Sequence, residues 1–259
     1  MITSISNKQV KHIIQLNKKS KARKEEDVFI VEGIKMFLEA PRELIRQVYV
    51  SKTFLAKEDN KRLLGDINYE VLEDSVFLAA CDTKTPQGIL CIVQQLHYEL
   101  SDILAKEPAH IMILEDLQDP GNMGTILRAG EGAGVSGIIL SKNCVDIYNP
   151  KTIRSTMGSI YRVPFFYTED TKNTIKTLQK NKISVFAAHL KKSQDYEKLD
   201  FTKGCAFMIG NEGNGLSEEL SAMADSYLKI PMEGSVESLN AGVAASILMY
   251  ETARQRRNK

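Results

Sequence analysis

Residues whose types are suited to chemistry lie in three loops of the C-terminal half. The first loop, Asp119–Gly124, reads Asp-Pro-Gly-Asn-Met-Gly and opens a predicted helix that carries Arg128. Asp-Pro-Gly is a turn signal, and Asn122 is suited either to capping the helix or to a site. Arg128 stands in a small, apolar stretch, where a guanidinium needs an anionic partner. We therefore expect Arg128 to meet either a nearby carboxylate or a phosphate.

The second loop, Gly210–Gly215, reads Gly-Asn-Glu-Gly-Asn-Gly and follows the apolar segment Cys205–Ile209. Its glycines let the backbone approach a ligand closely. The loop lacks the Gly-Lys-Ser/Thr of a P-loop, which argues against nucleoside triphosphate chemistry. Glu212 is the one ionisable group in the loop, and Ser217 is suited to capping the next helix. The strand-loop-helix order favours a ligand site over a solvated surface turn.

The third loop runs from Ile230 to Asn240 and contains Ser238. Ser238 and Asn240 are either helix caps or members of a site. The helix that follows begins with small residues, which permit tight packing inside one subunit or between two subunits.

A further glycine pattern, Gly132–Gly137, matches Gly-x-Gly-x-x-Gly. A dinucleotide site requires this pattern to follow a strand and open a helix. Here the predicted helix precedes the pattern and the predicted strand follows it. We therefore interpret it as a glycine helix stop and expect no nicotinamide or flavin site.

Hydrophobic patterns predict alternating strands and helices along the whole chain. The expected strands are Val28–Val31, Gln47–Val50, Tyr69–Leu72, Gly88–Val93, His110–Leu114, Gly137–Leu140, Val163–Phe166, Ile183–Ala187, Cys205–Ile209 and Tyr227–Ile230. The expected helices of the second half are Gly124–Ala133, Lys151–Met157, Thr171–Asn181, Ser217–Ala224 and Leu239–Arg256. Apolar strands without alternation, separated by helices, predict a parallel sheet covered on both faces. A polar stretch breaks the pattern, so we expect a first domain at 1–98, a linker at 99–109 and a second domain at 110–259.

The composition is that of an ordinary globular protein. Of the 259 residues, 43% are hydrophobic and 26% are charged. No run of about 18 apolar residues is present to span a membrane, and the first residues lack the apolar segment of a secretory signal. The four cysteines lie far apart without a Cys-x-x-Cys pair, so we expect no metal site, no disulfide and a reduced, cytoplasmic setting.

Positive charge is concentrated near the ends of the sequence, although the net charge is only +1. Residues 1–24 contain seven cations and no acid: Lys8, Lys11, Lys18, Lys19, Lys21, Arg23 and Lys24. Clustered cations suit the neutralisation of nucleic-acid phosphates, and a solvated helix face has the same composition.

Taken together, the three loops resemble the signature motifs of the SpoU/TrmH family of RNA ribose methyltransferases, in the SPOUT superfamily. The matching segments are Asp119–Gly124 with Arg128, Ile209–Leu216, and Ile230–Met232 with Ser235–Asn240. Their order and approximate spacing agree with the family. Phe29–Gly33 and Thr85–Ile89 resemble its N-terminal substrate-binding domain.

The resemblance implies an α/β fold in two parts. The C-terminal SPOUT domain would have a parallel sheet and a deep trefoil knot. The smaller N-terminal α/β domain would share the RNA-binding fold of a ribosomal protein that grips kinked RNA. The resemblance also implies a homodimer with sites near the subunit interface, and S-adenosylmethionine as the cofactor.

The resemblance further implies which residues act. The cofactor would be held around Gly210, Asn211, Gly213, Ile230, Met232, Ser238 and Leu239. The transfer site would contain Asn122, Arg128, Glu212, Ser238 and Asn240. Arg154 and the seven N-terminal cations are the candidate RNA contacts. Asn211 stands where many relatives have a small residue, and we expect this difference to matter little.

The expected activity is methyl transfer to a ribose 2′-hydroxyl, with large-subunit ribosomal RNA as first substrate and transfer RNA as second. Lowering a guanidinium pKa to near neutral costs about 7 kcal/mol, so we expect Arg128 to act as a cation and not as the base. A substrate phosphate, Glu212 or water is the candidate proton acceptor. The alternatives are methylation of a base and a non-catalytic RNA-binding or ribosome-assembly protein on the same scaffold.

Overall fold

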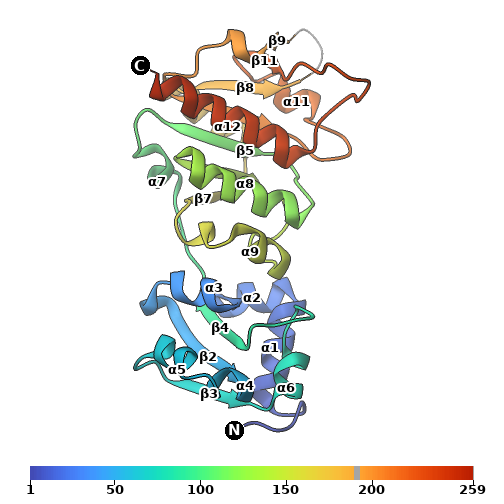
Figure 1. Ribbon diagram of the computed structural model, residues 1–259. Helices are drawn as coiled ribbons and strands as arrows, with labels where there is room; N and C mark the ends of the chain where they lie inside the picture. Colours follow the sequence, from blue (N-terminus) through green and yellow to red (C-terminus); the bar gives the residue numbers. More distant parts are fainter. Residues whose placement is uncertain (190–192, 259) are drawn as a thin grey trace. The chain divides into compact units, whose positions relative to one another are not determined.

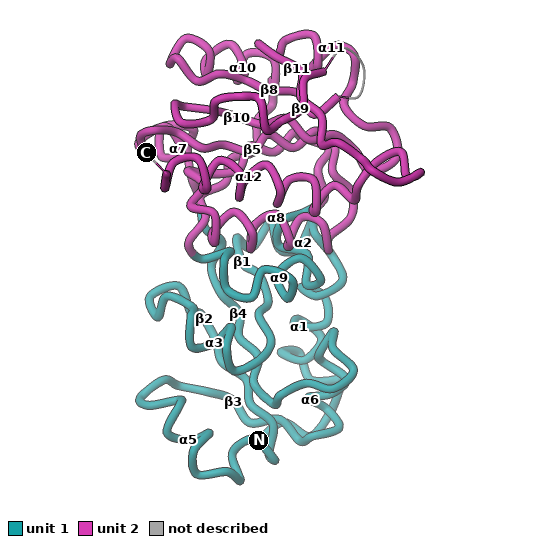
Figure 2. The backbone as a smooth tube through the Cα atoms, turned by 45° about the horizontal axis from the view of Figure 1, so that its top comes forward, with its two compact units in different colours: residues 1–96, 146–161 teal, residues 97–145, 162–259 magenta. Residues whose placement is uncertain are grey.

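The computed structural model describes residues 1–189 and 193–258. The chain divides into two compact units, shown in Figure 2. Unit 1 comprises residues 1–96 and 146–161, and unit 2 comprises residues 97–145 and 162–259. The division differs from the expected linear one, because residues 146–161 return to the N-terminal unit. They do so because helix α9 (Pro150–Thr156) packs against the first strand of that unit.

Unit 1 is built on a four-stranded mixed sheet of order β1-β4-β2-β3 (Figure 1). Its strands are β1 (Val28–Glu32), β2 (Ile45–Ser51), β3 (Tyr69–Leu72) and β4 (Ile89–Gln94), and all four were expected. Its helices are α1 (Lys8–Lys18), α2 (Ser20–Glu26), α3 (Ile34–Glu39), α4 (Lys52–Leu55), α5 (Glu58–Leu64), α6 (Asp74–Ala80) and α9, with 3-10 turns at Arg42–Leu44 and Ser159–Tyr161. β4 pairs antiparallel with β1 and β2, whereas β2 and β3 are parallel.

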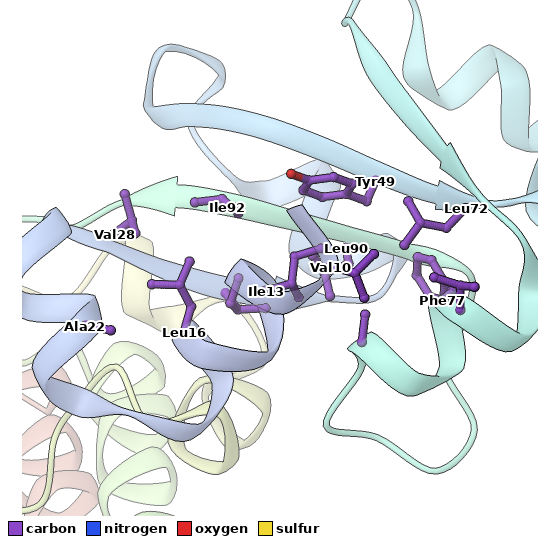
Figure 3. Close-up of a cluster of buried hydrophobic side chains, with 13 residues drawn as sticks. Val10, Ile13, Leu16, Ala22, Val28, Tyr49, Leu72, Phe77, Leu90 and Ile92 are labelled. Atoms are coloured by element: carbon purple, nitrogen blue, oxygen red, sulfur yellow. The ribbon is translucent and has the colours of Figure 1, made fainter. Parts of the chain in front are cut away.

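The core of unit 1 lies between its sheet and helices α1 and α6 (Figure 3). Val10, Ile13 and Leu16 share one face of α1 because they are spaced three residues apart, and each is fully buried. They pack with Leu90 on β4 and Phe77 on α6. This apolar stripe fixes which face of α1 points to solvent, and that face carries the lysines.

Unit 2 contains a seven-stranded sheet of order β7-β6-β5-β10-β8-β11-β9. Its strands are β5 (His110–Leu114), β6 (Gly137–Ser141), β7 (Phe165–Thr168), β8 (Ser184–Ala188), β9 (Gln194–Asp195), β10 (Cys205–Ile209) and β11 (Ser226–Lys229). Its helices are α7 (Leu100–Leu104), α8 (Pro120–Ala133), α10 (Thr171–Lys180), α11 (Glu218–Ser221) and α12 (Ala241–Arg257), with a 3-10 turn at Tyr196–Lys198. Every pairing in this sheet is parallel, which confirms the predicted sheet type.

Helices cover both faces of the unit 2 sheet. On one face, Ile103 of α7, Ile175 of α10 and Leu220 of α11 pack with alternate residues of β5, such as Ile111 and Ile113. On the other face, α12 packs along α8 and contacts β5 and β10 (Figure 1). Burial on both faces explains why the strands are continuously apolar in the sequence.

Local chemistry explains where helix α8 begins and ends. Asp119 caps α8 by accepting the N–H of Asn122, so this helix begins at Pro120 and Asn122 is not its cap. α8 ends at Ala133, and the φ of +74° at Gly134, which caps it, supports the predicted glycine helix stop. The expected linker contains α7, and the two-residue strand β9 was not expected.

Candidate functional site

Two loops of unit 2 are joined side by side by three side chains. They follow β5 and β10, which are neighbours in the sheet with Ile209 opposite Leu114. Glu115 accepts the N–H and hydroxyl of Ser217 at 2.8 and 2.6 Å. Asn211 donates to the carbonyl of Asp116 at 2.8 Å. The loop after β10 is therefore fixed to the loop after β5 at both of its ends.

Glu212 makes the third connection between these loops. Its Oε2 accepts the N–H of Gln118 at 3.1 Å, and its Oε1 accepts the N–H of Asp119 at 3.0 Å and the Asn122 amide at 2.9 Å. Partial burial by itself raises the pKa of Glu212, but these hydrogen bonds outweigh it and leave the pKa lowered. The carboxylate therefore stays ionised and holds the turn that begins α8.

Asn122 extends this connection to the third loop. Its Oδ1 accepts the Nδ2 of Asn240 at 2.8 Å. Asn240 in turn caps α12, because its Oδ1 accepts the N–H groups of Gly242 and Val243 at 2.9 and 3.2 Å. The chain from Glu212 through Asn122 to Asn240 brings together three of the expected transfer-site residues, one from each loop.

The glycine loop itself has little freedom. A Cβ added to Gly210 would lie 2.1 Å from the backbone carbon of Gly215, so only glycine fits there. The side chain of Asn211 also accepts the N–H groups of Gly213 and Asn214 at 2.9 and 3.2 Å. We expected Asn211 to matter little, yet its side chain closes the turn and ties it to Asp116.

A cavity of about 680 Å³ opens between this loop and the loop after β11. All seven expected cofactor residues line it: Gly210, Asn211, Gly213, Ile230, Met232, Ser238 and Leu239. Glu212 and Asn240 also reach it, together with Ala188 and His189 at the end of β8, which sequence reasoning missed. A pocket of this size, with apolar walls and exposed main chain, is suited to a nucleoside-sized ligand.

The comparisons with known proteins agree with this geometry. Residues 109–250 match the SpoU rRNA Methylase family. The chain belongs to the SpoU rRNA methylase family. Residues 7–91 match the MRM3-like substrate binding domain, which lies within unit 1.

Several relatives of this SpoU chain match it over nearly their whole length. The 23S rRNA (guanosine(2553)-2′-O)-methyltransferase RlmP of Bacillus subtilis is 29% identical, over 96% of this chain and 97% of its own. An AdoMet-bound rRNA methyltransferase from Sinorhizobium meliloti is 32% identical, with a TM-score of 0.85, over 98% of this chain and 97% of its own. The SpoU methyltransferase AviRb from Streptomyces viridochromogenes has a TM-score of 0.87 at 24% identity, over 97% and 98%, and so shares the fold.

Arg128 is placed differently from our expectation for this family. Its side chain is exposed on α8, and it is not among the residues that line the cavity. It follows Asn122 by six residues, which is about 240° around a helix, so the two side chains point to different sides. In the described part of the chain, no carboxylate pairs with it. The anionic partner we expected is therefore not one of these side chains.

The expected RNA contacts fall into two groups. Lys8, Lys11, Lys18, Lys19, Lys21 and Lys24 are exposed on α1, α2 and the turn between them. Arg23 is different, because its side chain is 3% exposed and pairs with Asp146 at 2.5 Å. Its Nη1 also donates to the carbonyl of Leu16 at 2.6 Å. This arginine is therefore structural, and its assignment to RNA was wrong.

Arg154 is one-third exposed and pairs with Asp82 at 2.6 Å within unit 1.

The four cysteines are free, and Cys91, Cys144 and Cys205 are buried. Across residues 1–189 and 193–258, no cluster of three or more His, Cys, Asp or Glu side chains is arranged to hold a metal ion. No helix in that part of the chain is long and apolar enough to cross a membrane.

Proposed function

We propose that this chain transfers a methyl group from S-adenosylmethionine to a ribose 2′-hydroxyl of RNA, with large-subunit ribosomal RNA as substrate. The observation that carries the proposal is the cavity, because the second and third family motifs line it from the loops after β10 and β11. Asn122 of the first motif is hydrogen-bonded to Glu212 and Asn240, which both line the cavity. The Sinorhizobium relative is named as an AdoMet-bound rRNA methyltransferase, and the Bacillus relative as a 23S rRNA 2′-O-methyltransferase. Transfer RNA is the second substrate to test.

The residues of the cavity fit S-adenosylmethionine. Ile230, Leu228 and Leu239 offer apolar surface for an adenine ring, and the main chain around Gly210 and Gly213 is accessible to polar groups of the ligand. The absence of a Cβ at Gly210 keeps the loop closed beside this surface. When bound, the cofactor supplies an electrophilic methyl group. The protein's part is to align the ribose oxygen with that group and to handle its proton.

Glu212 serves as a positioning residue in this proposal. Both of its oxygens already accept hydrogen bonds, and its pKa is lowered, so it is a poor acceptor for the hydroxyl proton. A substrate phosphate or water then takes that proton. Asn122 and Asn240 keep their amide groups oriented through the same chain of bonds, and Ser238 contacts the substrate from the cavity rim.

Arg128 acts in the site of a second copy of the chain in this proposal, which includes a homodimer. The exposed side of α8 and α12 carries Arg128 together with Val243 and Tyr250, which are 46% and 47% exposed. Large apolar side chains beside an arginine are typical of subunit interfaces. In the site of the second copy, the Arg128 guanidinium binds the phosphate next to the reacting ribose and stabilises the developing alkoxide charge.

The trefoil knot of the superfamily is also part of the proposal. The loop after β11 and helix α12 return against α8 and the Gly210–Gly215 loop, which is the arrangement that a threaded C-terminus requires. The exposed lysines of α1 and α2 supply phosphate contacts in the substrate-binding unit. The cytoplasm is the compartment that suits a ribosomal RNA substrate.

Calorimetry with S-adenosylmethionine, followed by label transfer to RNA, tests the function. We expect one cofactor site per chain and labelled RNA that yields 2′-O-methylated nucleosides after digestion. Deproteinised large-subunit rRNA and transfer RNA are offered in parallel to identify the substrate. Labelled bases would indicate base methylation. RNA binding without cofactor binding or transfer would indicate a non-catalytic ribosome-assembly protein and would overturn the proposal.

A further inference from the structure

Unit 1 has a cavity of its own, of about 440 Å³, at the carboxyl end of β2. Apolar groups of Phe54, Phe77 and Pro86 line it together with the polar side chains of Lys57, Asn60 and Gln87. A largely polar cavity with hydrogen-bonding side chains and a few apolar groups in its lining can receive an unstacked nucleobase and bind its polar edge. The volume is also large enough for one base.

Gln87 presents a fixed donor to this cavity. Its Oε1 accepts the N–H of Ile34 at 2.8 Å, at the start of α3. That bond orients the amide and leaves its Nε2 group available to a ligand. Asn60 is oriented the opposite way, because its Nδ2 donates to the carbonyl of Phe54 at 3.0 Å and leaves Oδ1 as an acceptor. The cavity therefore offers one donor and one acceptor, the combination that recognises the polar edge of a base.

The wall that carries Gln87 is preformed. The next residue, Gly88, has a φ of +88°. A Cβ there would lie 2.8 Å from Ser51 Oγ and 2.9 Å from the Cβ of Phe54. Only glycine allows this close approach, so the backbone is held tightly at the cavity. The amide of Gln87 thus has little freedom to lose when a ligand binds.

The charges of the cavity favour a base over a phosphate. The Asp74 carboxylate accepts the N–H and hydroxyl of Thr53 at 3.0 and 2.6 Å. Side-chain and backbone hydrogen bonds from Thr53 keep the pKa of Asp74 lowered, so it is ionised at neutral pH. A carboxylate repels a phosphate but accepts hydrogen bonds from the amino groups of bases. Lys57 is exposed at the rim, where it is suited to the phosphate of the same nucleotide.

We propose that this cavity takes one nucleobase flipped out of the RNA substrate, recognised by Gln87 and Asn60. The inference rests on the proposed function, because it requires an RNA substrate. It assigns to unit 1 a contact with an individual base in addition to phosphate contacts through its lysines. Recognition of this kind selects an RNA by its unstacked nucleotides and so adds to substrate choice.

The variant Gln87→Glu tests the proposal. A carboxylate still accepts the N–H of Ile34, but it replaces the free donor by an acceptor. We expect the affinity for a deproteinised large-subunit rRNA transcript to fall about five- to tenfold, the effect of one lost hydrogen bond. The matched control is Asn68→Asp, which places the same charge on an exposed residue outside the cavity lining and should leave affinity unchanged. Ultraviolet cross-linking of wild type to the same transcript should join a nucleotide to the segment 53–60 or 86–88.

The outcomes distinguish failure of the cavity proposal from failure of the proposed function. Equal affinities for wild type and Gln87→Glu, or cross-links in unit 1 that avoid both segments, would overturn the cavity proposal while leaving methyl transfer intact. Failure of wild type to bind RNA or S-adenosylmethionine would overturn the proposed function itself. Free AMP, UMP, CMP and GMP are titrated as well. Micromolar binding of a free nucleotide that Gln87→Glu abolishes, with RNA affinity unchanged, would show a small-molecule site instead. Cofactor affinity of each variant reports that unit 2 remains folded.

Discussion

Asn122 donates its side-chain amide to Glu212 and accepts the amide of Asn240, so one residue of α8 connects the second and third loops of unit 2. Turning the Asn122 amide over would lose two hydrogen bonds, and turning the Asn240 amide over would lose three, because Asn240 also caps α12. These bonds explain why Glu212 in the glycine loop, Asn122 in α8 and Asn240 at the start of α12 belong to one site. It also separates residues that position the site from residues that bind ligand.

The first prediction concerns Glu212→Gln. Glutamine keeps the shape but replaces one acceptor by an amino group. That group faces either the N–H of Gln118, or the N–H of Asp119 together with the Asn122 amide, and either placement leaves donors unpaired. We expect kcat/KM for S-adenosylmethionine to fall about 10- to 100-fold, the cost of roughly 1–3 kcal/mol for unsatisfied groups.

The positioning role of Glu212 also predicts how the rate depends on pH. Because the pKa of Glu212 is lowered, its bonds persist above the unfolded value of 4.5 and are lost only as pH falls further. A limb in the wild-type rate near neutral pH that Glu212→Gln removes would instead identify Glu212 as the base.

The second prediction compares two glycines of the same loop. Gly210→Ala forces a Cβ to within 2.1 Å of the Gly215 backbone, whereas the nearest atom at Gly213 is 3.4 Å away. We expect Gly210→Ala to weaken S-adenosylmethionine binding more than tenfold and Gly213→Ala to weaken it by less than about threefold. Calorimetry of the two variants checks this. Similar affinities for both would mean that the loop can open without cost.

The third prediction separates Arg23 from its lysine neighbours. Arg23→Ala leaves Asp146 without its buried partner, since the two side chains are 3% and 14% exposed. Breaking such a pair costs about 3–5 kcal/mol, so the free energy of unfolding should drop by that order. Lys24→Ala is the control, because Lys24 is exposed. It should leave stability unchanged and weaken RNA binding in a salt-dependent way. Denaturant melts measure the stability of each variant, and RNA binding at two salt concentrations measures its phosphate contacts. An Arg23→Ala variant as stable as wild type would contradict the structural role of Arg23.

The fourth prediction tests the partner role of Arg128. Arg128→Ala and Gly210→Ala should each be inactive as pure dimers. Mixing the two in equal amounts under conditions that exchange subunits should restore up to about a quarter of wild-type activity, because about half of the dimers are then heterodimers and each of these contains one complete site. Light scattering establishes the dimer, and label transfer to RNA measures the recovery. If no activity returns in mixtures shown to contain heterodimers, Arg128 serves its own subunit.

The fifth prediction concerns stability and pH. His110 is 1% exposed in β5, and burial, followed by the positive charges of Arg256 and Lys106, lowers its pKa to about 3. The unfolded chain binds a proton near the ordinary value of 6.5, so stability is lost as pH falls below that value. By pH 5 the loss from this group is about 2 kcal/mol. Denaturant melts at pH 7 and pH 5 should show this loss in the free energy of unfolding, and the His110→Leu variant should lose less between the two pH values. An equal drop in both proteins would exclude His110 as the cause.

The sequence determined most of the strands and the order of the loops that follow them, and it predicts where the ligand binds. Apolar runs such as Cys205–Ile209 are buried along their whole length, as expected for strands of a parallel sheet that is covered on both faces. Gly210 and Gly213 mark a loop after such a strand whose residues line the cavity. These signals are local, because an apolar run or a glycine turn is defined by residues that are neighbours in the sequence.

Only the tertiary structure decided which polar side chains support the site. Arg23 looks like its lysine neighbours in sequence, but its partner lies 123 residues away at Asp146. Glu115 and Ser217 are paired across 102 residues, and Asn211 meets Asp116 across 95. The return of residues 146–161 to unit 1 has no local signal either. Such pairs depend on which strands become neighbours, and the order of strands in a sheet is fixed by packing of the whole chain and not by periodicity.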